Sequence, residues 1–301
     1  MKTSAPRVLI AGYGQMGHAM QALLAQRARL AIWRVTPQHQ SPSAAIRRTA
    51  ADSDFVILCV PTVALAPLLH HLAPYAAPHA VFLSIAKGLD EAGRTAADIL
   101  ELQLGARRHW AVLGGPMIAA ELCAGRHGYA EIGTRNIAAQ RGTLWLFRGT
   151  RLHLSDGAWP QAVSWCGVLK NIYTPLFGLA DELDMGDNVR GRLASAALDE
   201  ISRLVARFAG VQHAAAGAAG LADLITTATS KSSHHRALGR RVARGDYSMP
   251  QGEGPNSVRV LQRRRRLPGT QAFPLLAVAV VLVRRPRAAR RHLCDWLEVG
   301  N

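Results

Sequence analysis

The feature that most constrains the fold is a glycine-rich turn close to the start of the chain. Residues 7–11 (Arg-Val-Leu-Ile-Ala) have the length and composition of a buried β-strand. They lead directly into Gly12-x-Gly14-x-x-Gly17, and apolar residues then repeat at helical spacing. A strand, this turn and a helix in succession are typical of a dinucleotide-binding βαβ unit. Gly12 would permit the tight turn, Gly14 the approach of a pyrophosphate, and Gly17 close packing of the helix on the strand.

The end of the next expected strand bears on the choice of dinucleotide. This strand, residues 30–33, ends at Arg34, and no acidic residue occurs from Leu30 to Ile46. An acid at this place would suit the ribose 2′-hydroxyl of NAD, whereas Arg suits the 2′-phosphate of NADP. The sequence therefore favours NADP over NAD, although Arg34 could also be one more arginine in an arginine-rich chain.

Two kinds of pattern divide the chain. The first half alternates short apolar runs with helical patterns, which predicts a parallel sheet covered on both faces. The further strands that we expect cover residues 55–60, 80–85, 110–113, 130–132 and 144–147. Near residue 157 strand patterns end, and an apolar stripe from Val189 to Phe208 predicts a long helix with Asp187 or Asn188 as N-cap and Gly210 as C-cap.

These patterns predict an α/β fold, a Rossmann-type doubly wound sheet followed by an all-helical substrate domain. The NAD(P)-binding domain would occupy residues 1–157 and the helical domain residues 158–301. The cleft between the two domains is the expected site.

The basic residues are almost all arginine. Of 36 Lys and Arg residues only Lys2, Lys87, Lys170 and Lys231 are lysine, and the net charge is +16. Ten arginines fall within residues 257–301. So many positive charges in one segment could bind a nucleic acid or an anionic membrane. No aromatic residue interleaves with Arg263–Arg266, as a base-stacking surface would require. We therefore interpret these arginines as solvated helix faces and expect no nucleic acid as partner.

The cysteines and the apolar runs exclude other classes. The four cysteines lie far apart, with no Cys-x-x-Cys pair and no histidine at metal-ligand spacing. This pattern argues against a metal site or a disulfide framework and favours buried thiols in a reducing, cytoplasmic location. The longest apolar run is shorter than the roughly 20 residues that span a bilayer, so no membrane span is expected.

An ordered set of motifs in the chain resembles one known family. The motifs are Ala86-Lys87-Gly88, Gly115-Pro116, Leu169-Lys170-Asn171, Gly220-Leu221-Ala222-Asp223-Leu224-Ile225-Thr226-Thr227, Ser233–Gly239 and Glu253-Gly254. From about residue 7 to 254 the chain resembles the NAD(P)-dependent sn-glycerol-3-phosphate dehydrogenases. The resemblance implies a homodimer that reversibly reduces dihydroxyacetone phosphate by hydride transfer, feeding glycerophospholipid synthesis.

The resemblance also implies catalytic roles. Lys170 matches the lysine that donates a proton to the C2 oxygen, and Lys87 a second lysine near substrate and cofactor. Asp223 matches the acid that orients Lys170, while Asn171 and Thr227 match polar groups of the same pocket. The chemistry is sensible in itself, because a ketone that receives hydride becomes an alkoxide, which a buried ammonium can stabilise and protonate. Arginine cannot donate a proton at neutral pH, so lysines at these positions are informative.

Other matched positions concern binding. Gln15 and Met16 would contact the pyrophosphate through their backbone, Gly115 and Met117 belong to the substrate-side loop, and Ala119 and Glu253 match cofactor contacts.

Two loops depart from the family. Its Ser-Arg-Asn-Arg loop, whose first Arg and Asn hold the substrate phosphate and whose Arg also lies near the cofactor, reads Ser233-His234-His235-Arg236 here. The two histidines could bind phosphate, more strongly once protonated below about pH 6.5, or Arg236 could take over. The family's Ser-Gly-Pro-Ser-Phe loop reads Gly114-Gly115-Pro116-Met117-Ile118. Two alternatives stay open: a related dehydrogenase of another small hydroxy acid, and a catalytically weakened cofactor-binding protein with a basic C-terminal surface.

Overall fold

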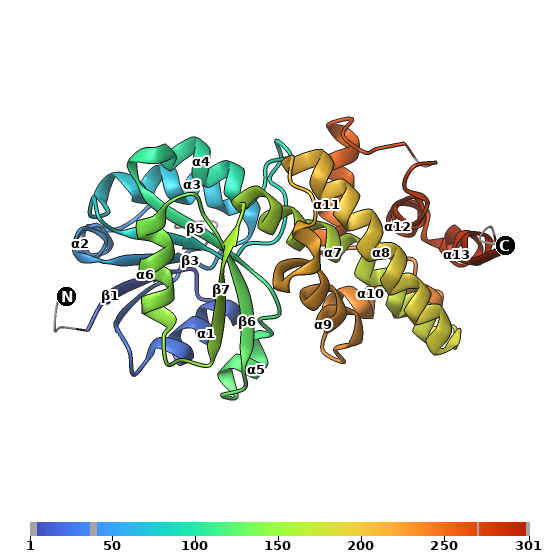
Figure 1. The fold of residues 1–301 in the computed structure, drawn as a ribbon, viewed down its shortest axis with the longest axis horizontal. Helices are drawn as coiled ribbons and strands as arrows, with labels where there is room; N and C mark the ends of the chain where they lie inside the picture. Colours follow the sequence, from blue (N-terminus) through green and yellow to red (C-terminus); the bar gives the residue numbers. More distant parts are fainter. Residues whose placement is uncertain (1–4, 37–40, 270, 299–301) are drawn as a thin grey trace.

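The first half of the chain builds one twisted sheet. The computed structural model describes residues 5–36, 41–269 and 271–298. Seven strands lie in the order β2-β1-β3-β4-β5-β6-β7 (Figure 1). They are β1 Arg7–Ala11, β2 Arg29–Trp33, β3 Phe55–Leu58, β4 Val81–Ser84, β5 His109–Gly114, β6 Gly128–Gly133 and β7 Leu152–Ala158. The helices between them are α1 Gln15–Leu24, α2 Ala44–Asp52, α3 Thr62–Leu72, α4 Ala96–Leu104, α5 Ala119–Cys123 and α6 Ile137–Phe147.

Alternation along β1 explains why the sheet is covered on both faces. Val8 and Ile10 belong to one buried cluster, together with Met20 of α1 and Leu146 of α6. Leu9 belongs to a second cluster, which contains residues of α3 and α4 and continues into the helical half. Successive side chains of a strand point to opposite faces, so an apolar strand of this kind needs a helical layer on each side.

The second half of the chain is helical. Its helices are α7 Pro160–Glu182, α8 Gly186–Ala209, α9 Asp223–Thr229, α10 His234–Ala243, α11 Glu253–Arg263, α12 Pro274–Arg284 and α13 Ala289–Glu298. In the described part of the chain no strand follows β7. Helix α7 is buried along almost its whole length, and α8, α9, α10, α11 and α12 pack against it (Figure 1). The predicted order, a Rossmann-type sheet followed by a helical domain, is confirmed. No helix of the described residues is long and apolar enough to cross a membrane.

Two predictions about elements were wrong, and one strand was missed. Residues 144–147, predicted as a strand, are the last turn of α6; periodicity cannot separate a strand from a buried helical turn in so short an apolar run. The strand β7 was not predicted. The sheet is not wholly parallel either, because β6 runs antiparallel to β5 while all other pairs are parallel.

The ends of α8 meet the prediction only in part. Gly210 ends the helix in the left-handed conformation at φ 69°, as predicted. Asp187 and Asn188 do not cap the other end, since the helix starts at Gly186 and both residues lie inside its first turn.

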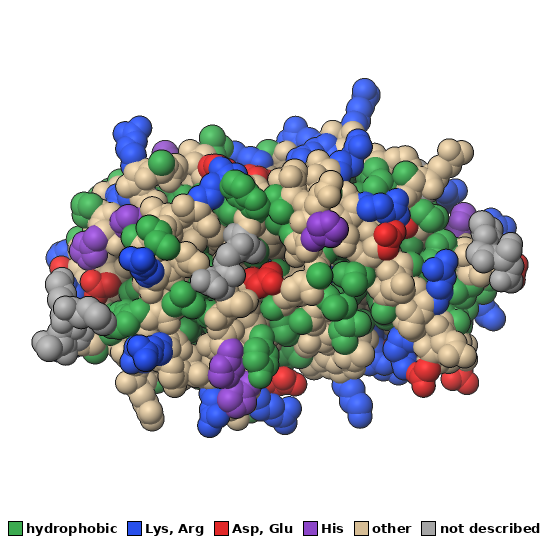
Figure 2. All heavy atoms as spheres, viewed as in Figure 1, with side chains coloured by type: hydrophobic (Ala, Val, Ile, Leu, Met, Phe, Trp, Pro, Cys, Tyr) green, Lys and Arg blue, Asp and Glu red, His purple; other side chains and the backbone are tan. Residues whose placement is uncertain are grey.

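Arg263 at the end of α11 and the arginines 264–266 that follow it are exposed, as the sequence predicted, but they also contact the rest of the protein. Arg263 forms an ion pair of 2.7 Å with Glu91, and Arg264 donates to the carbonyl oxygen of Glu91. Arg266 donates to the carbonyl oxygen of Gly93, and its guanidinium lies over the ring of Trp165. These contacts fasten α11 to the loop after β4. Figure 2 shows other basic side chains spread over both halves of the molecule.

Candidate active site

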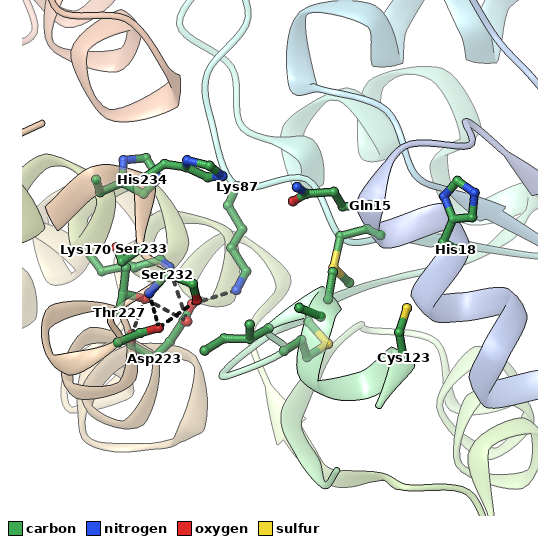
Figure 3. Close-up of a pocket in the computed structure, with 17 residues that line it drawn as sticks. Gln15, His18, Lys87, Cys123, Lys170, Asp223, Thr227, Ser232, Ser233 and His234 are labelled. Atoms are coloured by element: carbon green, nitrogen blue, oxygen red, sulfur yellow. Dashed lines mark hydrogen bonds and ion pairs between the residues drawn. The ribbon is translucent and has the colours of Figure 1, made fainter. Parts of the chain in front are cut away.

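A cavity of about 630 Å³ lies between the glycine turn and the helical half (Figure 3). The start of α1, the loop before α5, and helices α7, α9 and α10 contribute its walls. Eleven residues that the sequence had singled out line it: Gln15, Met16, Lys87, Met117, Ala119, Lys170, Asp223, Thr227, Ser233, His234 and His235. Positions more than 200 residues apart in sequence therefore share one cavity.

The glycine turn has the geometry that a dinucleotide needs. Gly12 has a φ of 97°, and a Cβ there would lie 2.4 Å from the carbonyl oxygen of Cys59 on the neighbouring strand connection. A Cβ on Gly17 would lie 2.4 Å from the carbonyl oxygen of Gly12, so the helix can start this close only without one. Gly14 faces open space, and no side chain caps the amino terminus of α1. The first N–H groups of α1 are thus available to a phosphate.

Two lysines and one carboxylate form the floor of the cavity. Lys170 Nζ lies 3.2 Å from Asp223 Oδ1 and donates to Thr227 Oγ1 at 2.7 Å. Lys87 Nζ lies 2.7 Å from Asp223 Oδ2 and donates to the carbonyl oxygen of Gly115 at 2.8 Å. Figure 3 shows these side chains converging from opposite sides on the Asp223 carboxylate. We call Lys87, Lys170, Asp223 and Thr227 the floor network.

Packing on α7 explains why the floor network forms. Lys170 sits within the most buried stretch of that helix and is only 6% exposed. A Cβ on Gly167 would lie 3.1 Å from Lys87 Cγ, so the missing side chain leaves room for the stem of Lys87. Asn171 of α7 holds the loop that carries Lys87, because its Nδ2 donates to the carbonyl oxygen of Lys87 at 3.0 Å. Its buried Oδ1 has no partner among the described residues.

Burial and charge tune the floor network. Burial lowers the pKa of Lys170 to about 8; Asp223 opposes this shift, and the ammonium of Lys87 adds to it. Burial would raise the pKa of Asp223, but the two ammonium groups outweigh it and hold the pKa below its usual value. The floor therefore offers an ionised carboxylate and a buried ammonium that can lose its proton near neutral pH.

The cavity is also lined by Ser230, Ser232, Ser233, His234 and His235, which we call the rim. The chemistry of the rim differs from the prediction. His235 is partly buried, and burial together with Lys170 and His234 lowers its pKa to about 3. It stays neutral at working pH, so the predicted gain of phosphate affinity through protonation below pH 6.5 is wrong for this residue. Exposed His234 lines the same rim.

Arg236, predicted as an alternative phosphate ligand, is turned elsewhere. Its guanidinium forms an ion pair of 2.6 Å with Asp181 of α7, which also pairs with Arg190 of α8 at 2.8 Å. Arg236 is not among the described residues that line the cavity. The reason lies in the close contact of α10 with α7, where a Cβ on Gly178 would lie 1.9 Å from the carbonyl oxygen of Arg236.

Two predicted cofactor residues lie beside the cavity. The guanidinium of Arg34 stands over the ring of Tyr13 in the glycine turn, 4.9 Å from its centroid. Glu253 lies behind Gly88, where its Oε1 would meet an added Cβ at 3.2 Å, and burial raises its pKa. Their contacts with a cofactor stay predictions.

Sequence reasoning missed six lining residues: His18, Ile118, Ala120, Cys123, Ser230 and Ser232. His18 follows Gln15 by three positions on α1, so helical spacing could have indicated it. Nothing in the sequence marks Cys123, which is exposed although we expected buried thiols. Burial raises the pKa of Cys59 and of Cys166 to about 12, as suits packing groups.

Comparison with known proteins agrees with this architecture. The model of the NAD-dependent glycerol-3-phosphate dehydrogenase N-terminus matches residues 35–139, and that of its C-terminus matches residues 160–280. The chain belongs to this family. It is thus an NAD(P)-dependent oxidoreductase, and the predicted family and class of cofactor are confirmed.

Members of the glycerol-3-phosphate dehydrogenase family that match this chain are only about 30% identical to it over the aligned residues. A glycerol-3-phosphate dehydrogenase [NAD(P)+] of Agrobacterium fabrum is 30% identical over 197 residues, which are 65% of this chain and 60% of that protein. One of Desulfovibrio desulfuricans is 29% identical over 262 residues, 79% of each chain. The crystal structure of glycerol-3-phosphate dehydrogenase from Coxiella burnetii has a TM-score of 0.84 at 22% identity, covering 98% of this chain and 99% of that one. This likeness shows that the fold is shared along the whole chain.

Proposed function

We propose that this chain reduces dihydroxyacetone phosphate to sn-glycerol 3-phosphate, reversibly, with hydride from NADPH or NADH. The observation that carries the proposal is the floor network, in which a buried lysine of lowered pKa opens into the cavity beside the glycine turn. The product would supply the backbone of glycerophospholipids.

Lys170 is the proton donor in this proposal. When bound, the nicotinamide supplies a hydride to the C2 carbon of the ketone. The ammonium of Lys170 stabilises the negative charge that develops on the C2 oxygen and transfers its proton there. Asp223 and Thr227 hold Nζ in place through contacts of 3.2 and 2.7 Å.

Lys87 binds the substrate and neutralises part of its negative charge. Its ammonium adds a second positive charge to the cavity, which balances a phosphorylated substrate, and it lowers the pKa of Lys170. Asn171 keeps the loop of Lys87 on α7. Gly115 and Met117 shape the substrate side, with Gly115 accepting a hydrogen bond from Lys87.

The direct test is oxidation of NADPH and of NADH by the purified chain with dihydroxyacetone phosphate. We expect turnover that needs both substrates, and identification of glycerol 3-phosphate as product. A chain that binds NADPH but oxidises none with this ketone would refute the proposal.

One observation favours a second candidate. The rim carries His234 and a neutral His235 where the family has an arginine and an asparagine for phosphate, and Arg236 beside them is engaged by Asp181. A dehydrogenase of a small unphosphorylated hydroxy acid would need no stronger cation there. Turnover with unphosphorylated 2-keto acids at higher kcat/KM than with dihydroxyacetone phosphate would favour this candidate.

We further propose that NADP is preferred, with Arg34 binding the 2′-phosphate. The stack of Arg34 on Tyr13 supports this, because it holds the guanidinium beside the glycine turn. Arg34→Asp should raise the Kd for NADPH at least tenfold and leave that for NADH nearly unchanged. Equal effects on both would discard the assignment.

A homodimer in the cytoplasm completes the proposal. The homodimer rests on the family resemblance. The cytoplasmic location rests on the four cysteines, each of which is free in the structure. Light scattering of the purified chain would decide the oligomeric state, with a mass of one 32.4 kDa chain contradicting it.

A further inference from the structure

We infer that Glu131, a carboxylate of the sheet, is a positioning residue that fixes Asp223 and through it the proton affinity of Lys170. Its role in catalysis rests on the function proposed above. Glu131 lies on β6, and Asp223 lies 92 positions further along the chain, at the start of α9. Nothing in the sequence motifs marks Glu131.

The contact is a pair of hydrogen bonds to backbone. Glu131 Oε1 accepts from the N–H of Ala218 at 2.9 Å, and Oε2 accepts from the N–H of Ala219 at 3.3 Å. These two N–H groups open a π-helical turn, Ala218–Ala222. At the start of a helical turn such groups have no partner within the helix, so the carboxylate satisfies them.

The same turn leads to Asp223 in one further step. The N–H of Asp223 bonds to the carbonyl oxygen of Ala218, the residue whose own N–H is held by Glu131. One residue, Ala218, thus links the carboxylate of Glu131 to the backbone of Asp223. The π turn is a rare element, and such turns are common at functional sites.

Gly217 shows that the chain is adapted to this contact. Its backbone, at φ −85° and ψ −161°, is extended and open to any residue, so conformation does not explain the glycine. A Cβ there would lie 1.8 Å from Glu131 Oε1. The missing side chain therefore serves to admit the carboxylate.

The consequence is electrostatic. Asp223 raises the pKa of Lys170 against the effect of burial, and it does so through contacts set by its position on α9. If the π turn shifts, Asp223 shifts with it and the pKa of Lys170 falls. An opposite charge at this range raises the pKa of a lysine by roughly 1–3 units, so a partial displacement of Asp223 should lower the pKa of Lys170 by about one unit.

Glu200 offers a matched control. This buried carboxylate of α8 also accepts from two backbone N–H groups, those of Leu275 and Leu276 at the start of α12, at 2.7 and 2.8 Å. Within the described part of the chain it forms no hydrogen bond or ion pair with the floor network. Glu131→Gln and Glu200→Gln each put an amide group where a carboxylate oxygen accepts, so both should lose stability, and only the first should change Lys170.

The experiment is titration of Lys170 itself. The chain has four lysines, so protein labelled with ¹³C and ¹⁵N in lysine gives four side-chain signals, and Lys170→Arg identifies that of Lys170 by its loss. We expect the pKa of Lys170 to fall by about one unit in Glu131→Gln, and likewise in Gly217→Ala, where Glu131 is intact but displaced. Glu200→Gln should leave it unchanged.

Either of two results would overturn the inference: an unchanged pKa of Lys170 in folded Glu131→Gln and Gly217→Ala, or an equal shift in Glu200→Gln. The readout needs no turnover. If the pKa shifts as expected but the parent chain does not reduce dihydroxyacetone phosphate, the proposed function fails and the positioning role of Glu131 stands.

Discussion

The floor and the rim of the cavity obey different constraints. In the floor network every charge is paired, because each ammonium has a carboxylate oxygen within 3.2 Å. The network is also buried, with Lys170 and Asp223 at most 6% exposed. The rim, formed by Ser230, Ser232, Ser233, His234 and His235, consists of hydroxyl and imidazole side chains that are exposed or partly buried. Burial thus determines the proton chemistry of the floor network, whereas the accessible side chains of the rim can vary and so determine which substrate is bound.

The largest expected effect is on the floor. Lys170→Met should lower kcat for ketone reduction by about 10³-fold, because it removes the proton donor while keeping an apolar stem in α7. Steady-state rates with NADPH would measure the loss. Lys231→Met, an exposed lysine of the rim loop, is the matched control and should stay within twofold; equal losses in both variants would abolish the distinction between floor and rim.

Asp223→Asn should affect both activity and stability. Without the carboxylate the pKa of Lys170 falls, and at pH 7.5 the rate of reduction should fall by about 10- to 100-fold. The free energy of unfolding should fall by about 3 kcal/mol, since two cations lose their partner.

Urea denaturation would measure that loss of stability. Asp199→Asn, which breaks an exposed pair with Arg203, should cost less than about 1 kcal/mol. A floor variant no less stable than this surface variant would contradict the account of a buried, coupled network.

A smaller change is expected from rebuilding the rim. The double change His234→Arg and His235→Asn should lower KM for dihydroxyacetone phosphate about tenfold at nearly constant kcat, because a charged hydrogen bond to phosphate is worth roughly 1.5–3 kcal/mol. KM for unphosphorylated dihydroxyacetone should not change. If KM for the phosphorylated ketone also stays constant, these positions do not touch the phosphate.

The floor network was predicted through the family resemblance, because Lys87, Lys170 and Asp223 fall on its ordered motifs; nothing in the sequence alone shows that these side chains meet. The strand, turn and helix around Gly12 and the long helix ending at Gly210 were accessible from the sequence itself, since their signals are local. The direction of Arg236 was not, because it depends on Asp181 and on the close approach of α10 to α7. Nor could the neutral state of His235 be foreseen, since it comes from burial and a nearby Lys170.

The pH dependence of kcat/KM shows whether Lys170 is a buried proton donor. Reduction needs the protonated ammonium, so kcat/KM should be level below about pH 8 and fall tenfold per unit above it, and oxidation of glycerol 3-phosphate should rise through the same pH. A reduction rate that stays level up to pH 10, near the usual pKa of an exposed lysine, would contradict the claim.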